Sequence, residues 1–137
     1  MKEIIASENE LIIVVEYLAK TVTKNAIIFL TGNLASGKTT LTKAIAKSRG
    51  ITDEVTSPTF SLQQCYGGDF FHYDIYRIEN QEFMELGLFE EFDKDGWHMV
   101  EWGDDALKFF LLSAGYDLFT VTITPYEDRR KYEIEKN

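Results

Sequence analysis

The order of apolar and polar positions along the chain predicts short strands separated by helices. Ala26–Thr31 is a short apolar run whose length fits a strand that is buried on both faces. Further strands are predicted over Met1–Ala6, Phe60–Tyr66, Phe70–Ile75, Trp97–Trp102, Leu118–Thr124 and Lys131–Glu135. Gly67-Gly68-Asp69 and Tyr126-Glu127-Asp128 are the turns of two predicted hairpins.

Helices are predicted between these strands. Ser7 with Glu10 three residues later has the pattern of a capping box, which predicts a helix from there to about Val22. Other helices are predicted over Thr39–Arg49, Asn80–Phe92 with an interruption at Gly87, and Asp104–Ser113. Strands alternating with helices, with hairpins around them, indicate an α/β fold: a three-layer sandwich with a mixed central sheet. No repeat or linker divides residues 1–137, so we expect a single domain.

Composition narrows the class of protein. The 137 residues are 45% hydrophobic and 14% aromatic, and 23 Asp and Glu against 14 Lys and Arg give a net charge of −9. Such a chain is a poor match for the phosphates of nucleic acid or for an anionic membrane. Cys65 has no second cysteine with which to form a disulfide, and the apolar run Leu11–Val15 is too short for a membrane span or signal peptide. We expect a cytoplasmic protein that binds neither a membrane nor nucleic acid directly.

One motif in the sequence is specific for the binding of phosphate groups. The pattern G-x-x-x-x-G-K-[ST], also called Walker A, is matched in full, and the predicted loop consists of Gly32, Asn33, Leu34, Ala35, Ser36, Gly37, Lys38, Thr39 and Thr40. Such a loop directs backbone N–H groups at phosphate oxygens, and a side chain at Gly37 would block their approach. Lys38 is expected to bind the phosphates and Thr39 to ligate magnesium. Because a predicted buried strand precedes the loop and a predicted helix follows it, we predict a nucleotide-binding site with Mg²⁺.

A P-loop also needs an acidic residue at the end of a neighbouring strand to hold magnesium, directly or through water. Asp74 and Glu101 each end a predicted apolar strand, and composition alone does not rank them. Glu101 is equally suited to orienting an attacking water. His72 and His98 lie inside predicted strands, and we interpret them as ordinary buried or surface histidines rather than metal ligands.

Two further segments leave two interpretations open. The segment 55–60 carries the hydroxyl of Thr59 next to Pro58, and it is either a plain turn or a loop that senses the γ-phosphate. The basic cluster Arg129-Arg130-Lys131 lies at a predicted hairpin tip, and it is either an exposed turn or a contact to a base or phosphate.

Five short blocks occur in the order and at the spacing of one bacterial family. They are GNLASGKTT at 32–40, SPTF at 57–60, HYDIYRI at 72–78, ELGL at 85–88 and VEW at 100–102. On these blocks the chain resembles the TsaE family (formerly YjeE), small P-loop ATPases of tRNA threonylcarbamoyladenosine synthesis. The resemblance specifies the nucleotide as ATP or ADP and implies ATP hydrolysis coupled to turnover of a TsaB–TsaD complex. That complex modifies the adenosine 3′ of the anticodon in tRNAs that read codons beginning with A.

Carried over position by position, the resemblance implies roles for individual residues. Catalytic roles fall to Lys38, Glu101 and Thr59, and magnesium ligands are Thr39, Glu101 and Asp74, the last directly or through water. Arg130 is implied near the adenine. The sequence departs from the usual family loop at Ala35-Ser36, where Gly-Ala is common. If position 35 requires a positive φ, alanine there costs about 1 kcal/mol or more.

Two alternatives come from other classes of protein. A small P-loop metabolite kinase closes a lid whose arginines neutralise the transferred phosphoryl group. This chain has four arginines, at 49, 77, 129 and 130, and no Arg-rich segment. A module that uses nucleotide only to set its shape would show no turnover stimulated by partners. The accessory ATPase is therefore the function that we expect.

Overall fold

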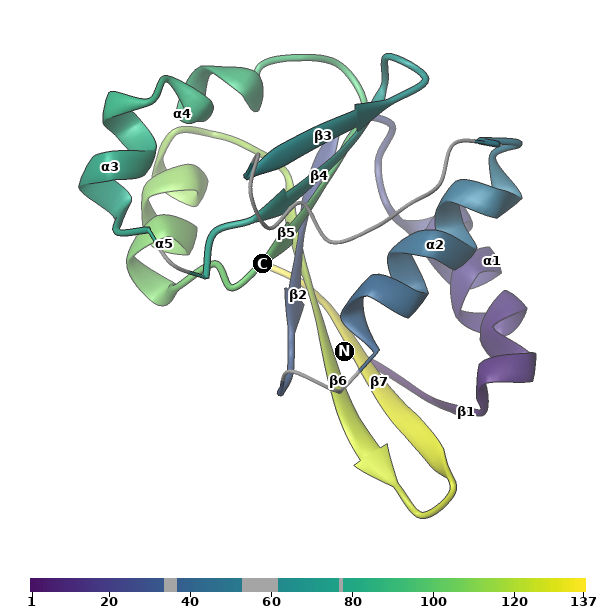
Figure 1. The fold of residues 1–137 in the computed structure, drawn as a ribbon. Helices are drawn as coiled ribbons and strands as arrows, with labels where there is room; N and C mark the ends of the chain where they lie inside the picture. The colour runs from purple at the N-terminus through teal and green to yellow at the C-terminus, as the bar shows by residue number, and fades with distance from the viewer. Residues whose placement is uncertain (34–36, 53–61, 77) are drawn as a thin grey trace.

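The computed structural model describes residues 1–33, 37–52, 62–76 and 78–137, and within them seven strands form one mixed sheet (Figure 1). Their order across the sheet is β1-β7-β6-β2-β5-β4-β3. The strands are β1 (Lys2–Ala6), β2 (Ala26–Thr31), β3 (Gln63–Tyr66), β4 (Phe70–Asp74), β5 (Trp97–Glu101), β6 (Leu118–Tyr126) and β7 (Arg129–Lys136).

The centre of this sheet is parallel and its edges are antiparallel. β2 runs parallel to β6 on one side and to β5 on the other, and β4 runs parallel to β5. β7 and β1 are added antiparallel at one edge and β3 at the other. The carboxyl ends of β2, β4 and β5 therefore lie together, and this is where ligands bind in open α/β sheets.

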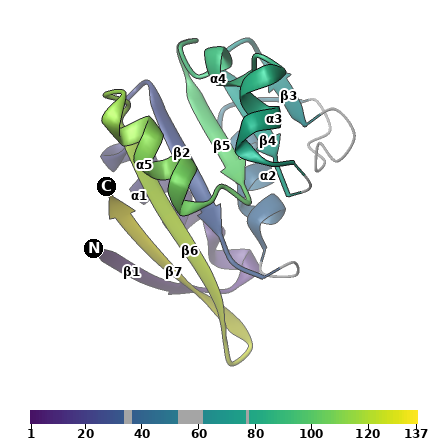
Figure 2. The same cartoon turned by 90° about the vertical axis from the view of Figure 1, so that its left-hand side faces the viewer.

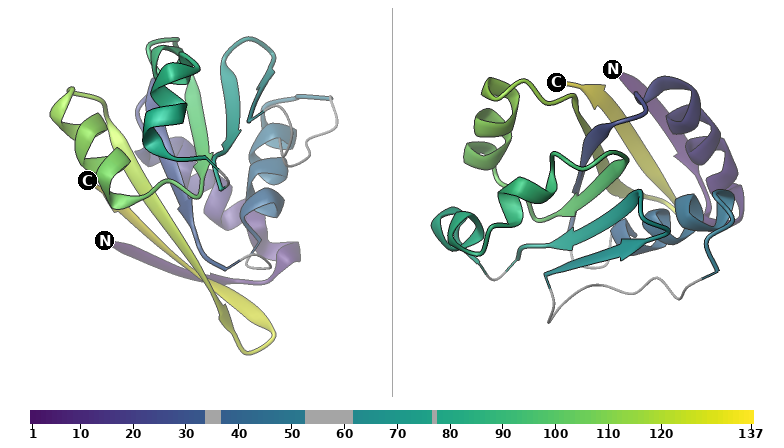
Figure 3. Two further views of the ribbon diagram at one scale, coloured as in Figure 1. Left: turned by 60° about the vertical axis from the view of Figure 1, so that its left-hand side comes forward. Right: turned by 90° about the horizontal axis from the view of Figure 1, so that it is seen from above.

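Helices cover both faces of the sheet (Figure 1 and Figure 3). Their bounds are η1 (Glu8–Glu10), α1 (Leu11–Thr21), α2 (Lys38–Ser48), α3 (Asn80–Glu85), α4 (Leu88–Glu91) and α5 (Asp105–Ser113). α1 and α2 lie on one face, and Figure 2 looks onto the other face, which carries α3, α4 and α5.

The core has two parts, one on each face of the sheet. Along β5, Trp97 and Met99 belong to the cluster beneath α1 and α2, whereas Val100 belongs to the cluster beneath α3, α4 and α5. This alternation is the consequence of the two-residue period of a strand that is covered on both sides. The structure thereby confirms the three-layer α/β sandwich with a mixed sheet. Among the described residues, no helix has the length and apolar character needed to cross a membrane.

The elements agree with the sequence-based expectations in type and differ at their ends. The capping box of Ser7 and Glu10 is present, but it opens a 3₁₀ turn before α1 begins. Gly87, with a φ of 75°, divides the helix predicted over residues 80–92 into α3 and α4. The closing hairpin is longer than predicted, because pairing continues to Tyr126 opposite Arg129.

Candidate nucleotide-binding site

The predicted phosphate-binding loop connects β2 to α2. Gly37 precedes the first residue of α2 and has a φ of 102°, a conformation that favours glycine. A Cβ atom at Gly37 would lie 2.3 Å from the Arg130 Nη1 atom, so a side chain here would displace the guanidinium. Leu34, Ala35 and Ser36 lie outside the described residues, and so do Thr59 and Arg77.

Lys38 is buried at the start of α2, with 3% of its surface exposed. Its Nζ donates hydrogen bonds to the backbone oxygens of Gly32 at 2.7 Å and Asn33 at 3.0 Å. Burial lowers the pKa of Lys38 below its usual value, and the nearby carboxylates of Glu101 and Asp74 oppose this shift. The ammonium group is thus held against the loop, where the motif requires a cation for phosphates.

The ring of Trp102 lies beneath this ammonium group, with its centre 4.2 Å from Lys38 Nζ. Trp102 has a φ of 67°, in the left-handed region that bulky residues rarely adopt. Tyr76 packs on the same indole at 4.7 Å between ring centres. An aromatic face at this distance stabilises a cation, so Trp102 helps to hold Lys38 in place.

Glu101, at the end of β5, is the acid that reaches the start of α2. Its Oε2 accepts a hydrogen bond from the Thr39 hydroxyl at 3.1 Å. The same oxygen lies 2.5 Å from His72 Nε2 on β4. Because a carboxylate only accepts hydrogen bonds, His72 Nε2 is the donor. The Thr39 hydroxyl and His72 Nε2 therefore both donate to one oxygen of Glu101. This holds the carboxylate of Glu101 beside the hydroxyl of Thr39, and these are two of the predicted magnesium ligands.

Asp74, at the end of β4, lies beside Glu101 across the parallel ladder. Its Oδ1 accepts a hydrogen bond from the backbone N–H of Tyr76 at 3.1 Å. The two acids that the sequence left unranked are therefore neighbours, and Glu101 is the one that contacts Thr39.

Arg130, on β7, brings a second cation to the loop from a strand that is separated from β2 by β6. Its guanidinium lies over Gly37, and its Nη1 atom is buried without a hydrogen-bond partner in the part of the chain that the structure describes. A buried donor without a partner is costly, and the binding role of Arg130 stays a prediction. Asn33 is exposed and Thr40 is half-buried in the first turn of α2; their binding roles stay predictions.

Sequence reasoning missed His72. The sequence pattern indicates an ordinary buried or surface histidine, whereas the structure places it in contact with Glu101, 29 residues away. The available signal was its position two residues before Asp74, which puts both side chains on one face of a strand. Within the described residues, no group of three or more His, Cys, Asp and Glu is arranged to hold a metal.

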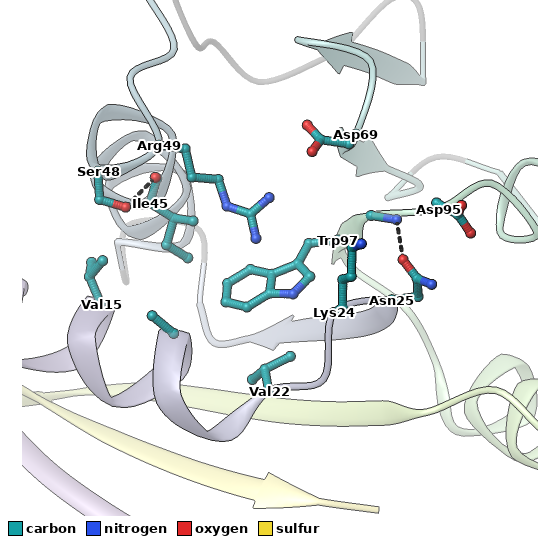
Figure 4. A pocket seen from close by; sticks show the side chains of 12 residues that line it. Val15, Val22, Lys24, Asn25, Ile45, Ser48, Arg49, Asp69, Asp95 and Trp97 are labelled. Carbon is teal, nitrogen blue, oxygen red and sulfur yellow. Dashed lines mark hydrogen bonds between the residues drawn. The ribbon is translucent and has the colours of Figure 1, made fainter.

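A separate cavity of about 460 Å³ lies between the end of α2, α1 and the start of β5 (Figure 4). The guanidinium of Arg49 lies 4.3 Å from the centre of the Trp97 ring, and Trp97 Nε1 donates to the backbone oxygen of Thr23 at 2.9 Å. Trp97 begins β5 and Glu101 ends it. This cavity is thus at the opposite end of the strand from the candidate site and is not part of it.

The fold and the site together define a protein of the P-loop NTPase class, in which a Gly-Lys-Thr turn joins a buried strand to a helix. The family model described as "Threonylcarbamoyl adenosine biosynthesis protein TsaE" matches residues 5–132, so the chain belongs to the TsaE family. This result confirms the resemblance that rests on the five sequence blocks.

Individual relatives agree with the family match. The tRNA threonylcarbamoyladenosine biosynthesis protein TsaE of Bacillus subtilis (strain 168) is 36% identical over 119 residues, which cover 79% of this chain and 73% of that protein. The protein of the same name from Haemophilus influenzae is 34% identical over 124 residues, or 87% of this chain and 76% of that protein. The crystal structure of Bacillus subtilis YdiB has a TM-score of 0.67 and is 24% identical, over 98% of this chain and 85% of that chain. This structural likeness supports the fold.

Proposed function

We propose that this protein is a Mg²⁺-dependent ATPase that acts in the formation of threonylcarbamoyladenosine in tRNA. The observation that carries the proposal is the meeting of Lys38, Thr39 and Glu101 at the carboxyl end of the parallel strands. Membership of the TsaE family, and the names of the relatives, support the tRNA modification pathway.

The residues present fit a magnesium nucleotide. Thr39 Oγ1 and Glu101 Oε2 are 3.1 Å apart, close enough for both to bind one ion. Thr39 and Glu101 would hold the metal, with Asp74 as a ligand directly or through water. When bound, Mg²⁺ neutralises charge on the β- and γ-phosphates.

Each side chain then has a distinct task. Lys38 would exchange the carbonyls of Gly32 and Asn33 for phosphate oxygens, because its ammonium already lies on the loop. Glu101 would orient the attacking water as well as the metal. His72 would keep the Glu101 carboxylate in position, and Arg130 would donate its free Nη1 hydrogens to the nucleotide. Thr59 is proposed for the catalytic loop on the family resemblance alone.

The proposed partners are the TsaB and TsaD proteins, in the cytoplasm. ATP hydrolysis by this chain would be coupled to turnover of their complex. The net charge of −9 supports contact with proteins rather than direct binding of tRNA.

The test is Mg²⁺-dependent ATP hydrolysis by the protein alone and with the TsaB–TsaD pair, with Lys38→Ala as the matched variant. We expect the pair to stimulate hydrolysis, and Lys38→Ala to weaken nucleotide binding at least about tenfold, because a charged hydrogen-bond donor is lost. Hydrolysis by Lys38→Ala at the wild-type rate would refute the loop assignment. Hydrolysis by the wild type that is indifferent to the pair would refute the coupling.

A further inference from the structure

The negative charge of the chain is concentrated in one segment. Residues 78–107 hold ten Asp and Glu but a single Lys or Arg, Lys94, so this segment alone accounts for the net charge of −9. The segment forms α3, α4 and β5 and the start of α5, on the face seen in Figure 2. The rest of the chain is balanced in charge. Of these acids, Glu101 faces the α2 layer and Asp95 lines the cavity beside α1, and the other eight make the layer of α3, α4 and α5 strongly acidic.

An apolar groove opens within this acidic layer, between α3 and α5. Its volume is about 220 Å³, and its lining residues are Asn80, Gln81, Met84, Ala106, Leu107 and Phe110. The side chains of Met84 and Phe110 are 44% and 43% exposed, although both are large and apolar. Leu86 at the end of α3 and Phe109 on α5 are more exposed still, at 57% and 74%. Apolar exposure gathered around one depression is typical of a contact surface for another molecule.

The groove adjoins the candidate nucleotide site. Its two helices follow β4 and β5, the strands that end in Asp74 and Glu101. The Asn80 side chain joins the starts of the helices, because its Nδ2 donates to both carboxylate oxygens of Asp104 at 3.1 and 3.2 Å. Asp104 in turn accepts the backbone N–H of Leu107 at 2.8 Å. These hydrogen bonds join the starts of the two helices that line the groove, and each helix follows a strand that ends in an acid of the site.

We propose that this α3–α5 groove is the docking surface for a protein partner that inserts an apolar side chain flanked by Lys and Arg. An apolar anchor fills a depression of this size, and the surrounding carboxylates match a basic rim on the partner. The same carboxylates repel the phosphates of tRNA and of lipid headgroups. The choice of the TsaB–TsaD pair as the partner rests on the proposed function, whereas the groove itself does not depend on it.

Two pairs of matched variants test the groove. Met84→Glu places a charge in the groove, and Ile12→Glu places one on α1, where Ile12 is 55% exposed on the opposite layer. Glu85→Lys reverses the charge of the side chain that accepts a hydrogen bond from Gln81 of the groove, and Glu16→Lys reverses a charge on α1. Affinity for the TsaB–TsaD pair is measured in the presence of Mg-ATP. We expect Met84→Glu to weaken binding about tenfold or more, as loss of an anchor contact does. Glu85→Lys should weaken it less and reduce its salt dependence, and the α1 variants should bind normally.

Nucleotide binding and basal hydrolysis are measured on every variant and should remain at the wild-type level. Equal binding of the pair by Met84→Glu and Ile12→Glu would overturn the docking proposal and leave the proposed function standing. A helical peptide with a leucine stripe between lysines is the second probe. If the pair does not bind the wild type but the peptide still distinguishes Met84→Glu from Ile12→Glu, the groove is supported and the proposed partner is wrong. Self-association of the wild type that Met84→Glu abolishes would identify a second copy as the occupant and overturn the proposal.

Discussion

His72 and His98 lie on neighbouring parallel strands and both are buried, yet they face different layers and have different surroundings. His72 faces α2, and its Nε2 donates to Glu101, which also accepts from Thr39. Its Nδ1 is buried without a hydrogen-bond partner among the described residues. Its one hydrogen bond is therefore to a carboxylate of the candidate site.

His98 faces the layer of α3, α4 and α5, and both of its ring nitrogens have partners there. Nε2 lies 2.8 Å from the backbone oxygen of Lys94 and Nδ1 lies 2.6 Å from the Tyr73 hydroxyl. The ring stacks on Phe71 with 4.4 Å between ring centres. Since the carbonyl requires a donor, the neutral ring bonds through Nε2–H and accepts from Tyr73. The comparison teaches that the layer a histidine faces, rather than the apolar strand around it, decides whether it serves the site or the core.

The largest expected effect comes from the acid that His72 contacts. Glu101→Gln keeps the shape of the side chain but removes its charge, so Mg²⁺-dependent hydrolysis should fall about 100-fold or more, as for loss of a general base. Nucleotide binding through Lys38 should persist. Steady-state hydrolysis and binding of a non-hydrolysable ATP analogue measure the two effects. Tyr73→Phe, on the opposite face of the sheet, is the control and should hydrolyse ATP normally. Wild-type hydrolysis by Glu101→Gln would remove Glu101 from the chemistry.

For His98, which packs in the core, the expected effect is on the stability of the fold rather than on nucleotide binding. His98→Ala deletes a packed ring and leaves the Tyr73 hydroxyl and the Lys94 carbonyl without their partner. The free energy of unfolding should fall by about 2–4 kcal/mol, from the cavity and the unpaired groups together. Urea denaturation measures this loss. Affinity for Mg-ATP, measured well below the melting temperature, should be unchanged. A parallel loss of affinity would contradict the separation of the two layers.

A smaller effect is expected for His72, because it acts through Glu101. His72→Phe removes the hydrogen bond to the carboxylate and should raise the Mg²⁺ concentration for half-maximal hydrolysis about 10–100-fold, as for other residues that orient a metal ligand. His72→Gln retains an N–H donor and should recover most of this loss. A merely structural role predicts that both variants lose stability while the dependence on Mg²⁺ stays the same. That result would exclude His72 as a positioning residue.

Local sequence patterns predicted the separate parts of the site, namely the loop after β2 and the acids that end β4 and β5. They did not predict which of these side chains are in contact. β2 was predicted with its observed bounds because an apolar run of six residues followed by a glycine turn has few other interpretations. The ends of the last hairpin were wrong because pairing across β6 and β7 extends beyond the residues that favour strands. The choice between Asp74 and Glu101, and the role of His72, depend on the register of β4 against β5. Register arises from packing of the whole sheet, so no local pattern reveals it.

The smallest expected effect is a pH dependence that only the core histidine should produce. Burial lowers the pKa of His98 below its usual value of 6.5. As the pH falls through 6.5 the unfolded chain takes up a proton at His98 while the native state does not, so protonation favours unfolding. The contribution of neutral His98 to stability is therefore complete above pH 6.5 and is lost progressively below it. The slope should be at most about 1.4 kcal/mol per pH unit, the value for one proton.

The measurement is urea denaturation of the wild type and of His98→Gln between about pH 7.5 and about pH 5, at about half-unit steps. The difference between the two proteins isolates the slope that is due to His98. Identical slopes would show that His98 binds its proton equally in both states.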